Sequence, residues 1–287
     1  SHLATCYEGA LMIRTRMVLT MVTLTSMLTQ GTMGQTISES DSAAQRAETN
    51  TLGSEYPRID AKRRITFRIA APNAQLVQLM PGGKDNGIGT GPFDMTRGAD
   101  GVWTIQTGPA VPGFHYYWFL VDGVETNDRG SHAFFGWGKE CSGVEVPDPK
   151  GDFYANKNVP HGHVRSHWYY SPTTKMSRRA IIYTPPGYDH SHSRYPVLYL
   201  QHGAGESETG WTEQGHVNFI IDNLIAERRC EPLIVVMENG MHAPAVGAET
   251  TPKSGRRNSA FGQMLVNDLV PEVDREYRTL ADSDHRA

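Results

Sequence analysis

The hydrophobic pattern changes once along this chain of 287 residues, and that change limits the folds available to it. Across residues 56–146, apolar and polar residues alternate in short runs such as RRITFRIAAP, VWTIQTG and HYYWFLVDG, and Gly, Pro, Asn or Asp closes each run. Alternation of this kind is typical of strands with one buried face. The sequence therefore predicts an all-β sandwich over residues 56–146, with tight turns at Gly101 and Gly123.

A different order follows the Pro-rich and Gly-rich bridge at residues 147–160. The segments HGHVRSHWYYS and RRAIIYTPPGY can pair as a hairpin, and the apolar runs VLYL and LIVVM are typical of strands covered on both faces. Between those runs, apolar residues recur at helical spacing: Val217, Ile220, Ile221, Leu224 and Ile225. Strand and helix thus alternate, which predicts a mostly parallel α/β sheet over residues 161–287.

The first 55 residues divide into two further segments. In residues 1–35, a basic start at Arg14 and Arg16 precedes a modest apolar run, and small residues then offer a cleavage point, as in a secretory signal. An amphipathic or disordered leader is the alternative, but the run is too short and too rich in Thr for a membrane span. We expect a secreted or periplasmic protein, with a flexible polar linker at residues 36–55.

Charge and cysteine content exclude some partners and bonds. With 27 basic and 31 acidic residues interspersed, the chain has no basic stripe for a phosphate backbone, so we expect no nucleic-acid partner. Of three cysteines, Cys6 lies in the leader, and Cys141 and Cys230 alone do not make a disulfide framework. We expect two free thiols, although export would permit a bridge between them.

The stretch HGAGES, residues 202–207, is the first motif that suggests chemistry. It directly follows a predicted strand, and Gly203 and Gly205 allow a sharp turn whose backbone N–H groups face open space. Such N–H groups stabilise the negative oxygen that forms during acyl transfer. An ordinary glycine turn between a strand and a helix is the alternative interpretation of the same residues.

Histidines offer a second kind of site. If HGHVRSHWYYS is a strand, His161 and His163 share one of its faces, as two metal ligands would. No neighbouring Cys or carboxylate completes a set of four ligands. We therefore expect no metal and no other cofactor.

The segments YPVLYLQHGAGESETGWTEQGHVNFIIDNLIAE, PLIVVMENG and NDLVPEVDREYRTL follow one another in the C-terminal half. Through them, residues 158–287 resemble the carbohydrate esterases that include feruloyl and acetylxylan esterases, the esterase D-like α/β-hydrolases. The resemblance implies a serine hydrolase that removes hydroxycinnamate or acetate from plant cell-wall polysaccharide or from small esters. It also implies that the backbone N–H of Ala204 or Gly205 is the oxyanion donor and that Trp211 is a wall of the acyl pocket.

Members of that family carry the nucleophilic serine on a G-x-S-x-G elbow after a further strand, and the acid and the histidine follow it. The 287 residues hold no G-x-S-x-G, so no residue of the family triad can be assigned. We expect a chain that stops before the elbow and forms the N-terminal half of the esterase domain. Ser207 with His202 or His216 is the substitute pair that proximity in sequence allows.

A sheet interrupted in this way would leave one edge of the strand at residues 197–200 without a neighbour. The unpaired N–H and C=O groups of such an edge readily pair with another chain. We therefore expect self-association through this strand.

The N-terminal block carries RITFRIAAPNAQLVQL and DGVWTIQTGPAVPGFHYYWFLVDG, through which it resembles the early-set, immunoglobulin-like modules that precede many carbohydrate-active enzymes. Some of these modules bind glycans by stacking aromatic rings on sugars. In the loop FFGWG, Phe134, Phe135 and Trp137 are therefore candidates, and packing of the two domains together is the alternative role. Trp103 and Trp118 lie in alternating strands and are expected in the core.

Three functions remain open from the sequence. The first is an ester hydrolase lineage whose substrate is acylated polysaccharide or a small ester. The second is a non-catalytic fragment that binds carbohydrate or self-associates, and the third is a hydrolase with a rearranged active site. Turnover of aryl esters together with labelling of a single serine would separate the third from the second.

Overall fold

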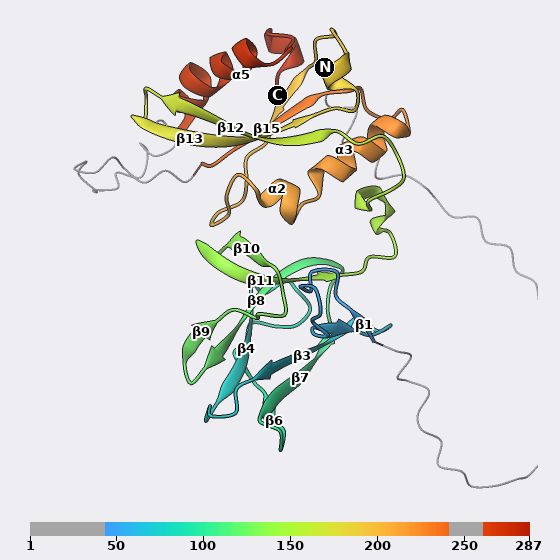
Figure 1. Ribbon diagram of the computed structural model, residues 1–287, viewed down its shortest axis with the longest axis vertical. Coiled ribbons are helices and arrows are strands. Elements are labelled where there is room, and N and C mark those ends of the chain that lie inside the picture. The colour runs from blue at the N-terminus through green and yellow to red at the C-terminus, as the bar shows by residue number, and fades with distance from the viewer. Residues whose placement is uncertain (1–43, 241–260) are drawn as a thin grey trace, which may run out of the picture.

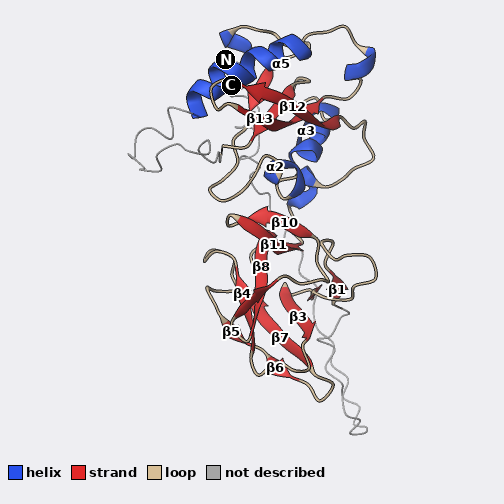
Figure 2. Ribbon diagram, turned by 60° about the vertical axis from the view of Figure 1, so that its left-hand side comes forward, coloured by secondary structure: helices blue, strands red, loops and turns tan. Residues whose placement is uncertain are grey.

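The structure is a computed structural model that describes residues 44–240 and 261–287 (Figure 1). The described residues form two bodies that follow each other along the long axis of the molecule (Figures 1 and 2). We call residues 44–146 the N-terminal module and residues 161–287 the C-terminal module, and residues 147–160 connect them. The signal-like leader lies outside the described residues.

The N-terminal module contains two sheets in which every strand pair is antiparallel. The first sheet has the order β1 (Gln45–Arg46), β2 (Arg58–Ile59), β3 (Arg64–Ala70), β7 (Val102–Pro109) and β6 (Thr96–Arg97). The second has the order β10 (Ala133–Gly136), β11 (Lys139–Val146), β8 (Gly113–Val121), β4 (Val77–Pro81) and β5 (Phe93–Asp94), and β9 (Val124–Thr126) also pairs with β8. Short connections between successive strands favour this antiparallel arrangement.

Alternate residues of both sheets form one shared core. Ile65 and Phe67 of β3 and Val77 and Leu79 of β4 are fully buried and belong to the same apolar cluster. Trp103 is buried in this cluster too, as predicted. The period of two in the sequence therefore identifies the buried face of these strands correctly.

Trp118 is buried, but outside this core. Its neighbours in β8, Tyr117 and Phe119, belong to the core, so Trp118 points to the opposite face of the sheet. There it packs edge-on against Trp137, with ring centroids 6.2 Å apart. Trp118 is thus buried as predicted, on the face of the sheet opposite the shared core, where the ring of Trp137 packs against it.

Residues 45–55 belong to the N-terminal module and do not form a linker. β1 pairs with β2, the backbone N–H of Thr51 donates to the Gly130 carbonyl at 2.9 Å, and Ala47 is 5% exposed. The prediction of a flexible linker over residues 36–55 is therefore wrong for this part, because its small polar residues pair with segments that are distant in sequence. Residues 36–43 lie outside the described residues.

The C-terminal module has one sheet of four strands, and only one of its strand pairs is parallel in the described part of the chain. Parallel neighbours need a crossover of a dozen or more residues, and residues 200–233, which carry two helices, supply one between β14 and β15. The predicted hairpin forms one of the antiparallel pairs. Antiparallel pairs outnumber the parallel pair, so the prediction of a mostly parallel sheet is wrong. The order is β12 (His163–Ser171), β13 (Met176–Thr184), β15 (Ile234–Glu238) and β14 (Val197–Tyr199).

Helices cover both faces of this sheet (Figure 1). On one face, Ile181, Tyr183 and Val235 pack against helix α3 (Val217–Ala226), which follows the short helix α2 (Gly210–Glu213). The opposite face packs against a π-helical turn, η3 (Leu265–Leu269), that continues into α5 (Val270–Glu276). Short 3-10 turns complete the module and its connection: η1 (Gly151–Tyr154), η2 (Tyr188–His190) and η4 (Ser283–His285). Among the described helices, none is long and apolar enough to cross a membrane.

The outer edge of β14 is occupied by residues 278–287. The Tyr195 N–H donates to the Arg278 carbonyl at 2.9 Å, and the Tyr199 N–H donates to the Ala287 carbonyl at 2.7 Å. Parallel bridges join the same two segments. The prediction of a bare edge at residues 197–200 is therefore wrong, and self-association through this strand loses its physical basis.

Among the described residues, Cys141 and Cys230 form no disulfide bond with each other, and only Cys141 is buried. They lie in different modules, Cys141 in β11 and Cys230 after α3. Burial raises the pKa of the Cys141 thiol, which keeps it protonated and unreactive.

Candidate functional site at the junction of the two modules

The loop after β14 lies at the carboxyl end of the parallel pair β14–β15, which is where open α/β sheets bind ligands. Within it, the Glu206 N–H donates to the Gly203 carbonyl at 3.2 Å and closes a turn. Gly205 has a φ of 85°, a left-handed conformation that favours glycine. We call residues 203–206 the glycine turn.

Two backbone N–H groups in the glycine turn are open. Those of Ala204 and Gly205 donate to no acceptor among the described residues, and Ala204 is exposed. Adjacent N–H groups without an acceptor are the arrangement that an oxyanion requires. The oxyanion role of Ala204 and Gly205 stays a prediction, with this geometry in its favour.

A carboxylate and a phenol from different modules meet beside this turn. The Tyr116 hydroxyl of β8 donates to Glu206 Oε1 at 3.0 Å, and the Gly203 N–H donates to Glu206 Oε2 at 3.1 Å. Burial, together with the nearby Glu206 carboxylate, raises the pKa of Tyr116, so its phenol remains a donor. Sequence reasoning missed this pair, since the two residues are 90 positions apart and no motif contains both.

The hairpin that joins β10 to β11 touches the glycine turn with its tip. Trp137 and Gly138 form the tip, both with positive φ, 57° and 74°, as in the two-residue turns typical of hairpins. The Gly138 N–H donates to the Gly205 carbonyl at 2.8 Å. A Cβ on Gly205 would lie 3.2 Å from the Trp137 backbone, so this contact leaves no spare room.

The aromatic residues of FFGWG divide into two groups. Phe134 and Phe135 are half-buried, Phe134 lies edge-on to Phe114, and the Phe135 carbonyl accepts from Gln214 Nε2 at 3.1 Å. The Phe135 contact favours the alternative role, packing of the two modules, whereas the Phe134 ring packs within the N-terminal module. The Trp137 side chain is 55% exposed, and its predicted role in binding substrate remains a prediction.

Trp211 lies in α2, close behind the glycine turn in sequence. Its ring is 36% exposed, and Nε1 donates to the Gln201 carbonyl at 2.9 Å. This hydrogen bond fixes the indole at the start of the loop. Its predicted place in an acyl pocket remains a prediction.

The structure does not bring Ser207 together with His202. Ser207 is buried, and its Oγ lies 3.2 Å from Thr209 Oγ1. His202 Nδ1 donates to the Gly203 carbonyl at 2.7 Å, and its Nε2 accepts from the Gly240 N–H at 3.0 Å. Both ring nitrogens of His202 therefore serve the backbone of the loop, and neither is available as a general base for Ser207.

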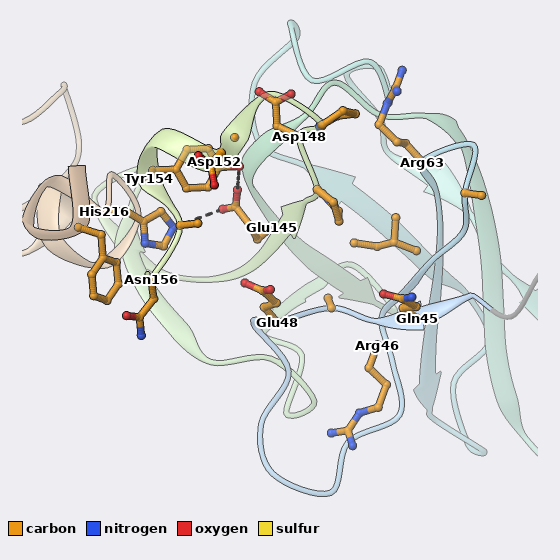
Figure 3. A pocket seen from close by; sticks show the side chains of 18 of the residues that line it. Gln45, Arg46, Glu48, Arg63, Glu145, Asp148, Asp152, Tyr154, Asn156 and His216 are labelled. Carbon is orange, nitrogen blue, oxygen red and sulfur yellow. Dashed lines mark hydrogen bonds and ion pairs between the residues drawn. The ribbon is translucent and has the colours of Figure 1, made fainter. Parts of the chain in front are cut away.

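His216 lies in a cavity of about 1000 Å³ between the modules, shown in Figure 3. Its ring stacks on Tyr154 with centroids 5.5 Å apart, and its Nε2 lies 3.7 Å from Glu145 Oε2. The Tyr154 hydroxyl donates to Glu145 Oε1 at 3.2 Å, and burial, with the nearby Glu145 carboxylate, raises the pKa of Tyr154 to about 12. Glu145 lies near the opposite end of β11 from the hairpin tip, so His216 is no partner for Ser207 either.

The two histidines of PHGH have separate partners. His161 Nδ1 lies 2.9 Å from the buried carboxylate of Asp222, which also accepts from the Tyr183 hydroxyl at 2.6 Å. His163 Nδ1 lies 3.1 Å from Asp189. In the part of the chain that the structure describes, no three side chains of the metal-binding types gather into a metal site.

Comparison with known proteins shows which proteins this chain is similar to. Residues 171–287 match the model of a family described as putative esterases. An endo-1,4-β-xylanase/feruloyl esterase of Xylanibacter ruminicola is 38% identical over 250 residues, 83% of this chain and 33% of that protein. Endo-1,4-β-xylanase Y of Acetivibrio thermocellus is 32% identical over 105 residues, 36% of this chain and 8% of that protein. The chain thus spans a third or less of the length of these relatives, and its similarity to ester hydrolases concerns part of each of them.

A solved structure shows the same fold at lower identity. The crystal structure of enterobactin esterase from Shigella flexneri, in the presence of enterobactin, aligns with this chain. The aligned region covers 78% of this chain and 63% of the enterobactin esterase chain. The TM-score is 0.54 and the sequence identity 18%. The likeness extends across both modules, because 78% of the chain exceeds either module alone.

Proposed function

We propose that the chain carries the oxyanion side of an ester hydrolase that removes hydroxycinnamoyl or acetyl groups from plant cell-wall polysaccharide or from small esters. The observation that carries this proposal is the pair of open N–H groups at Ala204 and Gly205, placed at the carboxyl end of the parallel strand pair. The names of the relatives, which include feruloyl esterase and xylanase, support the substrate class.

The proposed role of the two N–H groups follows from the negative charge that develops on the ester carbonyl oxygen during hydrolysis. Attack on an ester carbonyl turns its oxygen into an oxyanion, and a single fixed N–H donor at that oxygen contributes about 10²–10³ in rate. Ala204 and Gly205 supply two such donors, and Trp137 and Trp211 are exposed aromatic residues that suit a planar aromatic acyl group. No nucleophile, acid or base is assigned among the 287 residues.

The proposal includes an architecture. The N-terminal module is an immunoglobulin-like β-sandwich of the early-set type, supported by two antiparallel sheets around one core. The C-terminal module is the N-terminal half of an α/β-hydrolase domain, supported by the family match over residues 171–287. Export to the periplasm or outside the cell rests on the signal-like leader and on the nature of an insoluble polysaccharide substrate.

Binding of a product tests the proposal without requiring turnover. Sodium ferulate, titrated into the ¹⁵N-labelled chain, is expected to shift the amide resonances of Ala204 and Gly205 first, because its carboxylate accepts hydrogen bonds at the oxyanion position. Coniferyl alcohol, which has the same ring and no carboxylate, is the matched control and leaves those two amides in place. Ferulate-induced shifts confined to other regions, or none at all, would refute the assignment.

Assays of ester hydrolysis distinguish the proposed function from a hydrolase with a rearranged site and from a non-catalytic role. Methyl ferulate and p-nitrophenyl acetate are assayed with the same chain before and after treatment with a serine-directed phosphonate. Hydrolysis that is lost when one serine is labelled would replace the proposal with a hydrolase of rearranged site. Binding to insoluble xylan without any ferulate-dependent shift at the glycine turn would favour a non-catalytic carbohydrate-binding role.

A further inference from the structure

The glycine turn contacts the N-terminal module through two hydrogen bonds, and Gln214 adds two more beside them. The main chain of Gly138 donates to Gly205, and the Tyr116 hydroxyl donates to Glu206. Behind them, Gln214 Nε2 donates to the Tyr116 oxygen at 2.7 Å and also to the Phe135 carbonyl. Tyr116 is thus both a donor toward the turn and an acceptor from the residue that follows α2.

The Glu206 carboxylate could also accept hydrogen bonds from other backbone N–H groups of its own turn. Its carboxylate already accepts from the Gly203 N–H, and the N–H groups of Ala204 and Gly205 follow directly in the chain. A glutamate that is not held elsewhere can reach back to backbone N–H groups near it, as capping residues do. Such a carboxylate would occupy the donors that an oxyanion needs, and its charge would repel the oxyanion.

Tyr116 holds the Glu206 carboxylate away from those donors. Its hydrogen bond occupies Oε1, while Oε2 stays on the Gly203 N–H. A hydrogen bond to a charged acceptor is stronger than a neutral one, so this contact suffices to fix the side chain. The pair also ties the turn to β8, a strand at the centre of the second sheet of the N-terminal module.

We infer that Tyr116 and Glu206 are positioning residues, through which the N-terminal module keeps the oxyanion donors of the C-terminal module open. This inference rests on the proposed function for the meaning of the open N–H groups, but the contact itself is independent of it. The N-terminal module is accordingly a working part of the ester site in addition to any role in binding polysaccharide.

Tyr116→Phe is the direct test, with two readouts on the complete chain. We expect amide exchange in a peptide covering residues 200–209 to rise about tenfold, because one charge-assisted hydrogen bond is lost. We expect the Kd for sodium ferulate, followed at the Ala204 and Gly205 amides, to weaken by about the same factor. Tyr154→Phe removes a second Tyr–Glu hydrogen bond, that to Glu145, and should change neither quantity.

Glu206→Gln, combined with Tyr116→Phe, distinguishes competition by the carboxylate from simple loosening. Removing the charge from the unanchored side chain should restore most of the ferulate affinity, whereas exchange of the loop stays fast. Unchanged exchange in Tyr116→Phe, with β3 and β4 amides still protected, would overturn the inference. If the wild-type chain binds no ferulate, the proposed function fails, while the exchange measurement still decides whether Tyr116 positions the turn.

Discussion

In the N-terminal module the side chains between the two sheets are apolar with few exceptions, whereas the C-terminal sheet buries an ion pair. Arg178 Nε lies 2.6 Å from Glu238 Oε1, both side chains are at most 6% exposed, and the Tyr169 hydroxyl donates to the same carboxylate at 3.1 Å. Burial raises the pKa of Glu238, although Arg178 opposes the shift. Both modules therefore depend on apolar area removed from water, and the C-terminal module adds a matched pair of buried charges to its apolar clusters.

The position of the buried charge explains the difference. Glu238 is the last residue of β15, and Gly240, two residues later, donates to His202 at the start of the glycine turn. The ion pair thus stands directly behind the candidate site, where it fixes the backbone that leads into the loop. The apolar core of the N-terminal module lies away from the junction and supports the site only through the face that carries Tyr116.

The largest expected effect is the loss of the buried pair. Arg178→Met leaves the Glu238 carboxylate buried without a cation, which costs about 3–5 kcal/mol of unfolding free energy in urea denaturation. Arg165→Met, which breaks the exposed pair with Asp189, is the control and should cost less than about 1 kcal/mol. Adding Glu238→Leu to Arg178→Met should recover most of the loss; no recovery would mean that packing, and not charge, stabilises this sheet.

Truncation in the apolar core is expected to cost somewhat less. Leu79→Ala removes a fully buried side chain between the sheets, and we expect a loss of about 3 kcal/mol in the same denaturation experiment. Leu76→Ala, at a position 40% exposed, serves as the control with a loss below about 1 kcal/mol. Equal losses at the two positions would contradict the view that burial is the main force in this module.

A gain in stability is expected at the hairpin tip. Trp137 adopts a φ of 57°, which a bulky side chain seldom adopts, and Asn suits the first position of such a turn. Trp137→Asn should therefore raise the unfolding free energy by roughly 1 kcal/mol. A lower melting temperature would instead show that the contact of the Trp137 ring with Trp118 outweighs the backbone strain.

The smallest effect concerns pH. Burial raises the pKa of Asp128 above its usual 3.8, and the Tyr117 hydroxyl donates to it at 2.8 Å. The folded state then holds this proton more tightly, so the contribution to stability is full below pH 3.8 and is lost as the pH rises through the raised pKa. Asp128→Asn should show no such contribution. The unfolding free energy of the wild type minus that of the variant, measured by denaturation at pH values on both sides of the raised pKa, should therefore grow as the pH falls.

Local pattern was enough to predict several elements. The hairpin at residues 163–184, the strands VLYL and LIVVM and the helix after His216 all occur where their periodicity predicts them. The glycine turn was also found from its glycines. Each of these depends on neighbours within about ten residues, which a sequence displays directly.

The failed predictions depend on partners far along the chain. Residues 45–55 look like a linker until Thr51 meets Gly130, and the edge of β14 looks bare until residues 278–287 lie beside it. The contact between Tyr116 and Glu206 belongs to the same class, since no motif links two residues 90 positions apart. Long-range pairing of this kind is a property of topology, and a single sequence does not display it.

The main-chain hydrogen bond from Gly138 to Gly205 has a practical consequence for protein engineering. Because backbone meets backbone, and a Cβ on Gly205 would lie 3.2 Å from the Trp137 main chain, neither partner can be exchanged as an independent cassette. A chimaera that replaces the first module with one from another enzyme must keep the Ala133–Gly136 strand and its tip matched to residues 203–214. Shuffled fusions that ignore this match would join two intact folds around a misaligned glycine turn.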